Sequence, residues 1–368
     1  MVPPDTTIRG KTVIAVPTPV WPASRDLSVD LLRGTAIALM IGANAIPYLL
    51  LPPAPTALRF PASLAAPLFI LLAGMMVALS VTKKKYGAGH FLLRGGLVIA
   101  IAAVLDAAVW GYVPFLGMDV LYLIGIALPL TYLFLSCGET VRRALIVGIF
   151  CTGPVFWLLF GYAAQPVQVS LLPAAENLYA VTWGMAAGSW LFSGWFPVFP
   201  WLGFAFLGAE LGAVRWCGGG TRSFATPRIA LLALGSICTG AALWGIFSGP
   251  HFVRFGYVEL FYPAVPGFCF FTAGLIIGLF TLADLFPRMT RLLDPLRAMG
   301  ECALAIYIIH TIVIAGIIRP AGILLPVPQF LICAAVFVAG MCAVAYLFRY
   351  IRKGPAYRLR AVRFLTGG

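Results

Sequence analysis

The chain has 368 residues, of which 61% are hydrophobic and only 10% are charged. Soluble globular domains carry about 25% charged residues, so this composition excludes a soluble domain and indicates an integral membrane protein. The net charge of +13 is not taken as a nucleic-acid-binding surface, because basic loops and a basic tail beside anionic lipid account for it. Membrane lipids are therefore expected partners, and nucleic acids are not.

Ten hydrophobic segments follow one another along the chain, each long enough to cross about 30 Å of hydrocarbon as a helix. The segments are 30–51, 62–82, 92–112, 119–136, 143–162, 196–214, 229–248, 264–285, 298–318 and 328–348. They predict an all-α polytopic membrane protein with about ten transmembrane helices. The transmembrane domain spans 25–349, between a proline-rich arm over 1–24 that we expect to be disordered and a basic tail over 350–368. The arm lacks the apolar core of a cleaved signal peptide.

The Lys and Arg residues are distributed unevenly between the two sides of the membrane. When the loops are assigned to alternate sides, 22 of the 25 basic residues fall on one side. The other side receives only Arg59, Arg254 and Arg319. Since short cytoplasmic loops are enriched in Lys and Arg, both termini are predicted to be cytoplasmic, and the expected location is a prokaryotic plasma membrane.

The sequence contains none of the familiar motifs of soluble enzymes. There is no GxSxG, HExxH, P-loop or dinucleotide-binding fingerprint. The eight cysteines lie within the spans or at their cytoplasmic ends and show no CxxC spacing, so we expect neither a disulfide nor a metal site. Candidate functional residues must therefore be sought among the polar side chains of the spans.

Ionisable and amide side chains are costly inside a membrane, so each of them is a candidate for function. At 1.5 Å per residue from the nearest inner basic residue, Asn44, Asp106 and His310 lie roughly 16, 18 and 20 Å deep. Asp119 adds a carboxylate at the outer start of the fourth span. A histidine that shares its depth with a carboxylate and an amide suits general acid–base chemistry, whereas a lone histidine on an apolar helix is commonly a helix–helix hydrogen-bond partner. Both interpretations remain open.

A second polar group is predicted near the cytoplasmic surface. Glu301 follows Arg297 by four residues, which predicts an ion pair within one helix. Glu210 precedes Arg215 by five residues near the same surface. Both acids are interpreted as structural.

The longest loop, 163–195, contains no Lys or Arg and is rich in Trp, Tyr, Gly and Pro. Aromatic residues at this density indicate a segment in the outer headgroup layer. The loop is either an interfacial re-entrant stretch or a lid that binds an acceptor over an outward-facing pocket.

Five motifs occur in order from the first to the ninth span. They are 25–44, which begins RDLSVDLLRG, APLFILLAGMMVALS (66–80), VLYLIGIAL (120–128), FPVFPWLGFAFLGAELG (196–212) and GECALAIYIIHTIVI (300–314). Together they resemble membrane acyltransferases of the heparan-alpha-glucosaminide N-acetyltransferase type, within the broader acyltransferase type 3 group. The resemblance implies transfer of an acyl group, normally acetyl, from cytoplasmic acetyl-CoA to a sugar or similar acceptor on the far side.

The family's functional positions carry over only in part. The matching positions are Arg33, Gly34, Asn44, Pro67, Gly74, Trp201, Gly203, Tyr307 and His310. The family's active histidine lies shortly after the first-span asparagine, and here that stretch reads AIPYLLLPPAPTALRF, without a histidine. Either His310 with a carboxylate, Asp106 or Asp119, has taken over the role of base, or the acceptor chemistry differs, or the activity is lost.

Two further groups of residues are assigned from this resemblance. Basic residues at the inner surface are candidates for binding the CoA phosphates, although the topology rule alone also explains them. They are Arg33, Lys83, Lys84, Lys85, Arg94, Arg142 and Arg143. The candidates for binding the acceptor are Trp201, Tyr307 and His251.

Three functions therefore compete at this stage. The first is a transmembrane acyltransferase that uses acyl-CoA and a glycan or small-molecule acceptor. The second is a secondary transporter or lipid flippase, because buried Asp and His residues also serve proton relays. The third is a membrane scaffold descended from the enzyme. The oligomeric state, a homo-oligomer included, is left open.

Overall fold

The computed structural model describes residues 25–160, 167–171, 183–249, 253–254, 257–258, 260–354 and 364. Most of these residues are helical, and two short strands, β1 (Val253–Arg254) and β2 (Tyr257–Val258), pair antiparallel. The predicted arm over 1–24 and His251 lie outside the described residues, as does most of the tail beyond Gly354.

Eight helical segments of the described chain are long and apolar enough to cross a membrane. They are α1 (Leu27–Leu49), α2 with α3 (Thr56–Ser63 and Ala65–Lys84), α4 with the π-helix η1 (Ala88–Leu105 and Asp106–Trp110), α10 (Val198–Arg215), α11 (Pro227–Ile246), α12 (Pro266–Leu285), α15 with the π-helix η4 and α16 (Ala303–Val313, Ile314–Ile318 and Arg319–Ala321), and α17 (Val327–Ile351).

Two further apolar segments lie where the other two spans are predicted, so the described chain has eight candidate spanning helices, or nine if the bent pair is one span, against about ten predicted. α6 (Glu139–Phe150) and α7 (Thr152–Phe160) are bent by 49° at their junction and together make a broken span or a re-entrant segment. α5 (Val120–Leu135) is a shorter apolar helix of 16 residues. Each predicted span thus falls on apolar helix, and the all-α polytopic membrane fold is confirmed. The remaining helices are α9 (Trp183–Gly188), the π-helix η2 (Ser189–Ser193), the 3-10 helix η3 (Cys217–Gly219), α13 (Pro287–Leu292) and α14 (Asp294–Glu301).

Side-chain caps define the starts of several helices. The Asp26 carboxylate accepts a hydrogen bond from the Val29 N–H at 3.3 Å and begins α1. The Asp119 carboxylate accepts from the Val120 N–H at 2.7 Å and begins α5. Such caps satisfy N–H groups that the first helical turn leaves without a partner. Both aspartates also take part in the polar clusters described below.

Glycines bring two pairs of helices into backbone contact. A Cβ atom at Gly74 of α3 would lie 1.9 Å from the carbonyl oxygen of Ala205, and Gly208 of α10 makes a matching approach to α3. A Cβ atom at Gly95 of α4 would lie 2.3 Å from the carbonyl oxygen of Gly125 in α5. A larger residue at these positions would force the helices apart. The pairs α3–α10 and α4–α5 are therefore each in close backbone contact.

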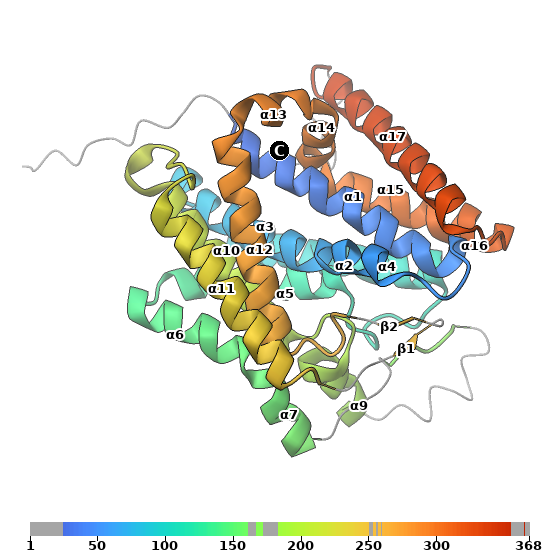
Figure 1. Cartoon of the computed structure of the whole chain (residues 1–368), viewed down its shortest axis with the longest axis horizontal. Coiled ribbons are helices and arrows are strands. Elements are labelled where there is room, and N and C mark those ends of the chain that lie inside the picture. Colours follow the sequence, from blue (N-terminus) through green and yellow to red (C-terminus); the bar gives the residue numbers. More distant parts are fainter. Residues whose placement is uncertain are drawn as a thin grey trace, which may run out of the picture.

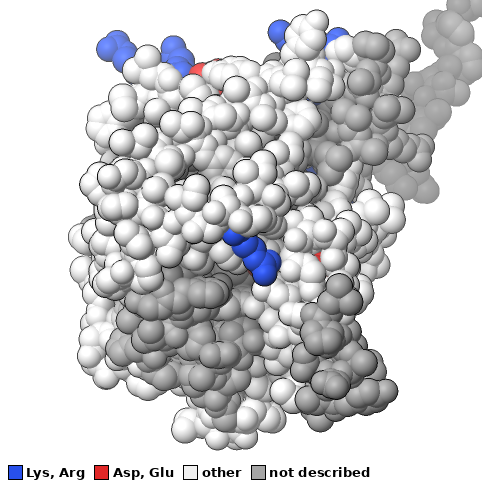
Figure 2. Space-filling view, turned by 90° about the vertical axis from the view of Figure 1, so that its right-hand side faces the viewer, with Lys and Arg blue, Asp and Glu red and all other residues white. Residues whose placement is uncertain are grey.

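The outward surface of the bundle is largely apolar. Leu231 and Leu234 of α11 are exposed, as are Ile332 and Val336 of α17. Figure 2 shows one broad face that is mostly uncharged, with basic side chains gathered along its upper edge and one more at mid-height. A surface of this kind suits a helical bundle surrounded by lipid, where all backbone groups are satisfied within the helices.

Basic residues from separate loops meet at one end of the bundle, which we call the basic end. There Arg25, Lys83 and Arg94 line a single cavity, although they come from the starts of α1 and α4 and the end of α3. In Figure 1, α13 and α14 lie at the top, and α7, α9, β1 and β2 lie at the bottom. The grouping matches the alternation of basic loops along the sequence, while the cytoplasmic orientation of this end stays a prediction.

A buried arginine joins three helices at the basic end. Arg215, whose side chain is 2% exposed, ends α10 and forms ion pairs with Asp26 at 2.5 Å and with Asp284 of α12 at 2.7 Å. Asp284 also accepts hydrogen bonds from the Ser28 hydroxyl and the Phe224 N–H. Every oxygen of both carboxylates is therefore engaged, which offsets the cost of burying the charges.

The predicted ion pair between Glu301 and Arg297 is not formed in the described structure. Glu301 instead faces α17 and pairs with Arg349 at 2.7 Å and with Arg352 at 3.0 Å. Arg297 pairs with Asp294 at 3.2 Å. The spacing of four residues places two side chains on one helix face, but partners on a neighbouring helix take precedence where that helix is close.

Candidate functional site

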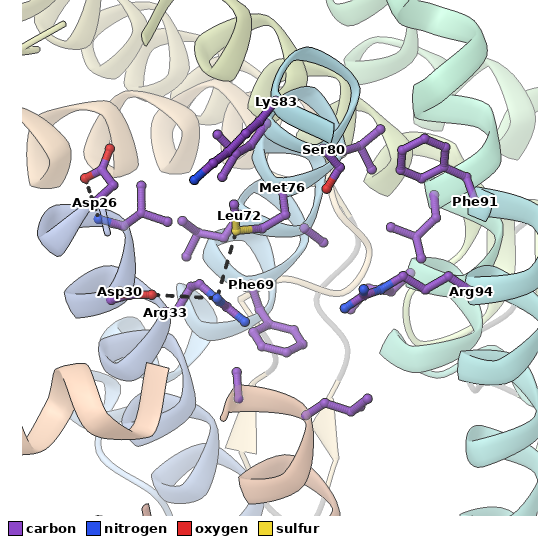
Figure 3. A pocket seen from close by; sticks show the side chains of 18 of the residues that line it. Asp26, Asp30, Arg33, Phe69, Leu72, Met76, Ser80, Lys83, Phe91 and Arg94 are labelled. Carbon is purple, nitrogen blue, oxygen red and sulfur yellow. Dashed lines mark hydrogen bonds and ion pairs between the residues drawn. The ribbon is translucent and has the colours of Figure 1, made fainter. Parts of the chain in front are cut away.

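A cavity of about 370 Å³ opens at the basic end between α1, α3, α4, α5 and α15. Its polar lining comes from the start of α1, the end of α3, the start of α4 and the segment after α10, namely Arg25, Asp26, Asp30, Arg33, Ser80, Lys83, Lys84, His90, Arg94 and Thr221. The remaining wall is mainly apolar and includes Phe69, Leu72, Met76, Leu121, Ile124, Ala303 and Leu304. Figure 3 shows Arg33 and Arg94 extending from opposite sides toward the same space.

The charges in this cavity are not balanced. Both acids are already engaged, because Asp26 binds Arg215 and Asp30 binds Arg25 at 2.9 Å. Arg33 lies 3.8 Å from Asp30 and 3.9 Å from the sulfur of Met76.

Three further cavity cations have no ion pair within the described part of the chain. They are Lys83, Lys84 and Arg94. Instead, Lys84 lies over the ring of Tyr86. The cavity therefore offers several cations to an anionic ligand.

The other predicted phosphate-binding residues lie outside this cavity. Lys85 ends α3 in the left-handed conformation, with φ 51°, and is exposed. Arg142 pairs with Glu210 of α10 at 2.7 Å, and Arg143 pairs with Glu139 on its own helix. The structure thus brings Arg33, Lys83, Lys84 and Arg94 together and leaves the other three elsewhere. The binding roles of all seven stay predictions.

A second polar cluster lies farther along the bundle and contains His310, which is completely buried. Its Nδ1 lies 3.1 Å from the Ile306 carbonyl oxygen, and its Nε2 lies 3.1 Å from the Asn44 side-chain nitrogen. A carbonyl can only accept and an amide nitrogen can only donate, so this network assigns the proton to Nδ1. The lone pair of Nε2 then accepts from Asn44. His310 and Asn44, predicted at a similar depth, are therefore in direct contact.

The two candidate aspartates of this region bind tyrosines and not the histidine. Asp106 accepts a hydrogen bond from the Tyr122 hydroxyl at 2.6 Å, and Asp119 accepts from the Tyr307 hydroxyl at 3.3 Å. The predicted orientation of His310 by a carboxylate is thus replaced by its bond to the Ile306 carbonyl. Tyr122 lies in the motif VLYLIGIAL (120–128) but was not singled out, because a tyrosine in an apolar helix is commonplace.

Tyr307 connects the cavity with the second cluster. Its ring stacks on Phe69, a residue of the cavity wall, with centroids 6.3 Å apart. The same ring meets His310 edge to face at 5.2 Å, while its hydroxyl reaches Asp119. One aromatic side chain therefore separates the cavity wall from the His310–Asn44 pair.

Three π-helices lie in the segments around the second cluster. η1 begins at Asp106, and η4 begins four residues after His310 and contacts η1. η2 contains Trp190, whose ring lies tilted against that of Tyr122 with centroids 5.4 Å apart. π-helical turns are rare in helices and are frequent at functional sites. They support a functional interpretation of this region.

Parts of the longest loop cover the same segments. The Val113 N–H donates to the Val169 oxygen and the Leu171 N–H donates to the Gly111 oxygen, each at 2.8 Å. The Trp190 Nε1–H donates to the Phe115 oxygen at 2.6 Å. These bonds fasten the described pieces of 163–195 over the turn that follows Asp106, as a lid would lie.

Trp201 occupies a different environment from the other acceptor-binding candidates. It is almost fully buried and contacts the rings of Phe196, Phe204, Phe261 and Phe268. Trp201 of α10 therefore belongs to an aromatic core between α10 and α12. Tyr307 lies at the second cluster, and His251 is outside the described residues.

Comparison with protein families gives one match over most of the membrane core. Residues 25–245 match the family model described as heparan-alpha-glucosaminide N-acetyltransferase, catalytic. No curated protein matches the chain significantly. The matched region contains Asn44 and every cavity residue of α1, α3, α4 and α5, while His310 and Tyr307 follow it.

Proposed function

Because the chain belongs to the heparan-alpha-glucosaminide N-acetyltransferase family of transmembrane acetyltransferases, we propose that it moves an acetyl group from cytoplasmic acetyl-CoA to an acceptor on the opposite side. The acceptor carries a hydroxyl or amine, as on a sugar. The observation that supports this most is the cavity, which has cations without acidic partners at its open end and Tyr307 between its wall and the His310–Asn44 pair.

The basic end is proposed as the entrance for the donor. With this end in the cytoplasm, Lys83, Lys84 and Arg94 attract the phosphates of CoA, and Arg33 lies deeper on the same path. The thioester arm then runs along the apolar wall toward Phe69. The alternative is that these cations only set the topology. It does not explain why Arg142 and Arg143 have acidic partners while Lys83, Lys84 and Arg94 have none in the described structure.

His310 is proposed as the acid–base residue. An acceptor hydroxyl or amine displaces the Asn44 amide from Nε2 of His310. A lone pair of the acceptor oxygen or nitrogen then attacks the thioester carbonyl carbon, and the acceptor proton passes to Nε2. The carbon–sulfur bond then breaks, and the CoA thiolate leaves with the proton from the imidazolium. The displaced Asn44 amide can donate to the oxyanion that forms in between. The bond to Ile306 keeps Nδ1 protonated throughout.

The acceptor is proposed to approach from the end opposite to the basic end. Tyr307, Asp106 and Asp119 supply hydroxyl and carboxylate groups there, and the pieces of 163–195 that bind Gly111, Val113 and Phe115 act as its lid. His251 of the neighbouring loop stays a candidate for acceptor binding.

A non-catalytic descendant is the second candidate, and one observation favours it. The lone pair of His310 is occupied by Asn44, and the histidine that the family places after its first-span asparagine is absent here. A protein of this kind could bind CoA without transferring an acyl group. A transporter, in contrast, would have no reason to bind CoA.

Purified protein in detergent with radiolabelled acetyl-CoA and a panel of amino sugars and polyols distinguishes these functions. We expect saturable CoA binding and label transfer. His310→Gln keeps a hydrogen-bonding side chain but cannot take up a proton, so it should reduce turnover by about a hundredfold or more and leave CoA binding intact.

The control is Gln329→Asn, at an exposed polar residue of α17 that does not line the cavity, which should retain turnover. Near-normal turnover of His310→Gln would make His310 a packing residue. CoA binding without transfer by the unsubstituted protein would favour the non-catalytic descendant.

A further inference from the structure

Arg94 receives an aromatic contact from the far end of the chain. Its guanidinium carbon lies 5.4 Å from the centre of the Phe364 ring. Phe364 is half-buried, lines the same cavity and packs against the main hydrophobic core. Nothing in the sequence pointed to this residue, which stands in a basic tail.

The contact leaves the hydrogen-bonding groups of Arg94 free. A cation–π contact uses the charge of the guanidinium and none of its five N–H donors. Arg94 has no acidic partner in the described part of the chain, and it extends into the cavity toward Arg33 in Figure 3. Its N–H donors are therefore available to a phosphate while the guanidinium lies over the ring.

Holding a long side chain in place lowers the entropy that binding costs. A free arginine loses rotamer freedom when it grips a ligand, and a side chain already fixed by a neighbour loses less. Lys83 is an instructive contrast, because no ring contact to it is seen among the described residues. Of these two cavity cations, Arg94 is the one that a ring contact restrains in the described structure.

We infer that Phe364 is a positioning residue of the donor cavity. Phe364 holds Arg94 so that the N–H groups of Arg94 face a phosphate ester of the donor. Through this residue the C-terminal end of the chain takes part in binding the donor. The inference rests on the proposed function, since it takes the phosphates of CoA as the anion. It assigns the tail a role beyond contact with lipid.

A double-mutant cycle on the full chain tests this role. The variants are Phe364→Leu, Arg94→Gln and both together, and the probes are CoA and pantetheine, the phosphate-free part of CoA. Phe364→Leu should weaken CoA binding about three- to tenfold, which is the size of one cation–π contact. The same change should add nothing in the Arg94→Gln background, and pantetheine binding should be unaffected.

Two further variants separate positioning from packing. Phe364→Tyr keeps the ring and should bind CoA like the unsubstituted protein. Phe286→Leu, at an exposed phenylalanine before α13 that does not line the cavity, is the matched control and should also be unchanged.

Several outcomes would overturn the inference. Tighter CoA binding by Phe364→Leu would mean that the ring blocks the cavity. An equal loss for pantetheine, or a full additional loss in the Arg94→Gln background, would mean a general packing role. Unchanged CoA affinity in Phe364→Leu would overturn the role of Phe364 alone, whereas no CoA binding by the unsubstituted protein would overturn the proposed function as well.

Discussion

Arg215 and Arg94 both lie at the basic end of the bundle and both lie over aromatic rings, but only Arg215 has acidic partners in the described structure. Arg215 is 2% exposed and is held between Asp26 and Asp284. Arg94 lines a cavity and has an aromatic ring, Phe364, in place of an acid. The cation that joins helices is saturated by carboxylates, whereas Arg94 in the cavity keeps its hydrogen-bonding capacity in the described structure. In the sequence both look like topology signals, and only their partners distinguish a structural charge from one available to a ligand.

The largest effect on stability is expected from removing Arg215, whose guanidinium is bound by two acids. Arg215→Met leaves Asp26 and Asp284 buried without their cation, which should lower the free energy of unfolding by about 3–5 kcal/mol. Thermal unfolding of purified protein in detergent, followed by size-exclusion chromatography, measures the loss. Arg222→Met is the control, because Arg222 is exposed. A variant as stable as the parent would show that the three-helix junction does not depend on this network.

Substitutions of the cavity cations should change the affinity for the ligand and leave the stability of the protein unchanged. Replacing Lys83 and Lys84 with glutamine should weaken CoA binding about tenfold and flatten its dependence on salt, because fewer phosphate contacts remain to be screened. Thermal stability should hardly change, since neither lysine has an acidic partner in the described structure.

Arg143→Gln provides the control for this pair. Its side chain is 66% exposed and pairs with Glu139 on its own helix. Equilibrium binding of CoA at low and high salt compares the variants. Equal weakening by Arg143→Gln would show that CoA senses the overall charge of the basic end and not the cavity.

The smallest effect concerns a partly exposed acid that joins α14 to α17. Hydrogen bonds from Arg349 and from the Tyr346 hydroxyl hold the pKa of Asp294 below its usual value. A lowered folded-state pKa stabilises the protein above the unfolded-state pKa, near 4, and this contribution is lost as pH falls through the folded-state pKa.

Asp294→Asn should therefore lower the melting temperature slightly at pH 7, by about 2 °C or less, because the pair is partly solvated. The difference from the unsubstituted protein should disappear as the pH is lowered below about 4. Melting curves of both proteins across this range provide the test. A difference that grows at low pH would contradict the assigned sign.

The sequence predicts the helices well because the bilayer sets their length and composition. Residue counting also put Asn44 and His310 at a similar depth, which works because a helix has a constant rise per residue. It could not predict which helices are neighbours. The partners of Glu301 and of the two aspartates Asp106 and Asp119 depend on that arrangement. Local spacing therefore gave the wrong partner for Glu301, and chemical expectation gave the wrong partner for the aspartates.

Residues without an ionisable or rare side chain were missed for a related reason. Tyr122 and Phe364 are ordinary members of an apolar and a basic segment, and only their position beside Asp106 and Arg94 gives them significance. The break between α6 and α7 was also missed, although Gly153 and Pro154 stand beside it and residues of these types commonly interrupt a helix.

The glycine contacts limit how the cavity can change its size. Gly74 and Gly208 hold α3 against α10, and Gly95 and Gly125 hold α4 against α5, so neither pair can slide internally without a backbone collision. The cavity is lined by α3 on one side, by α4 and α5 on another, and by α1 and α15. Widening it between α3 and α4 therefore requires one helix pair to move against the other as a rigid body.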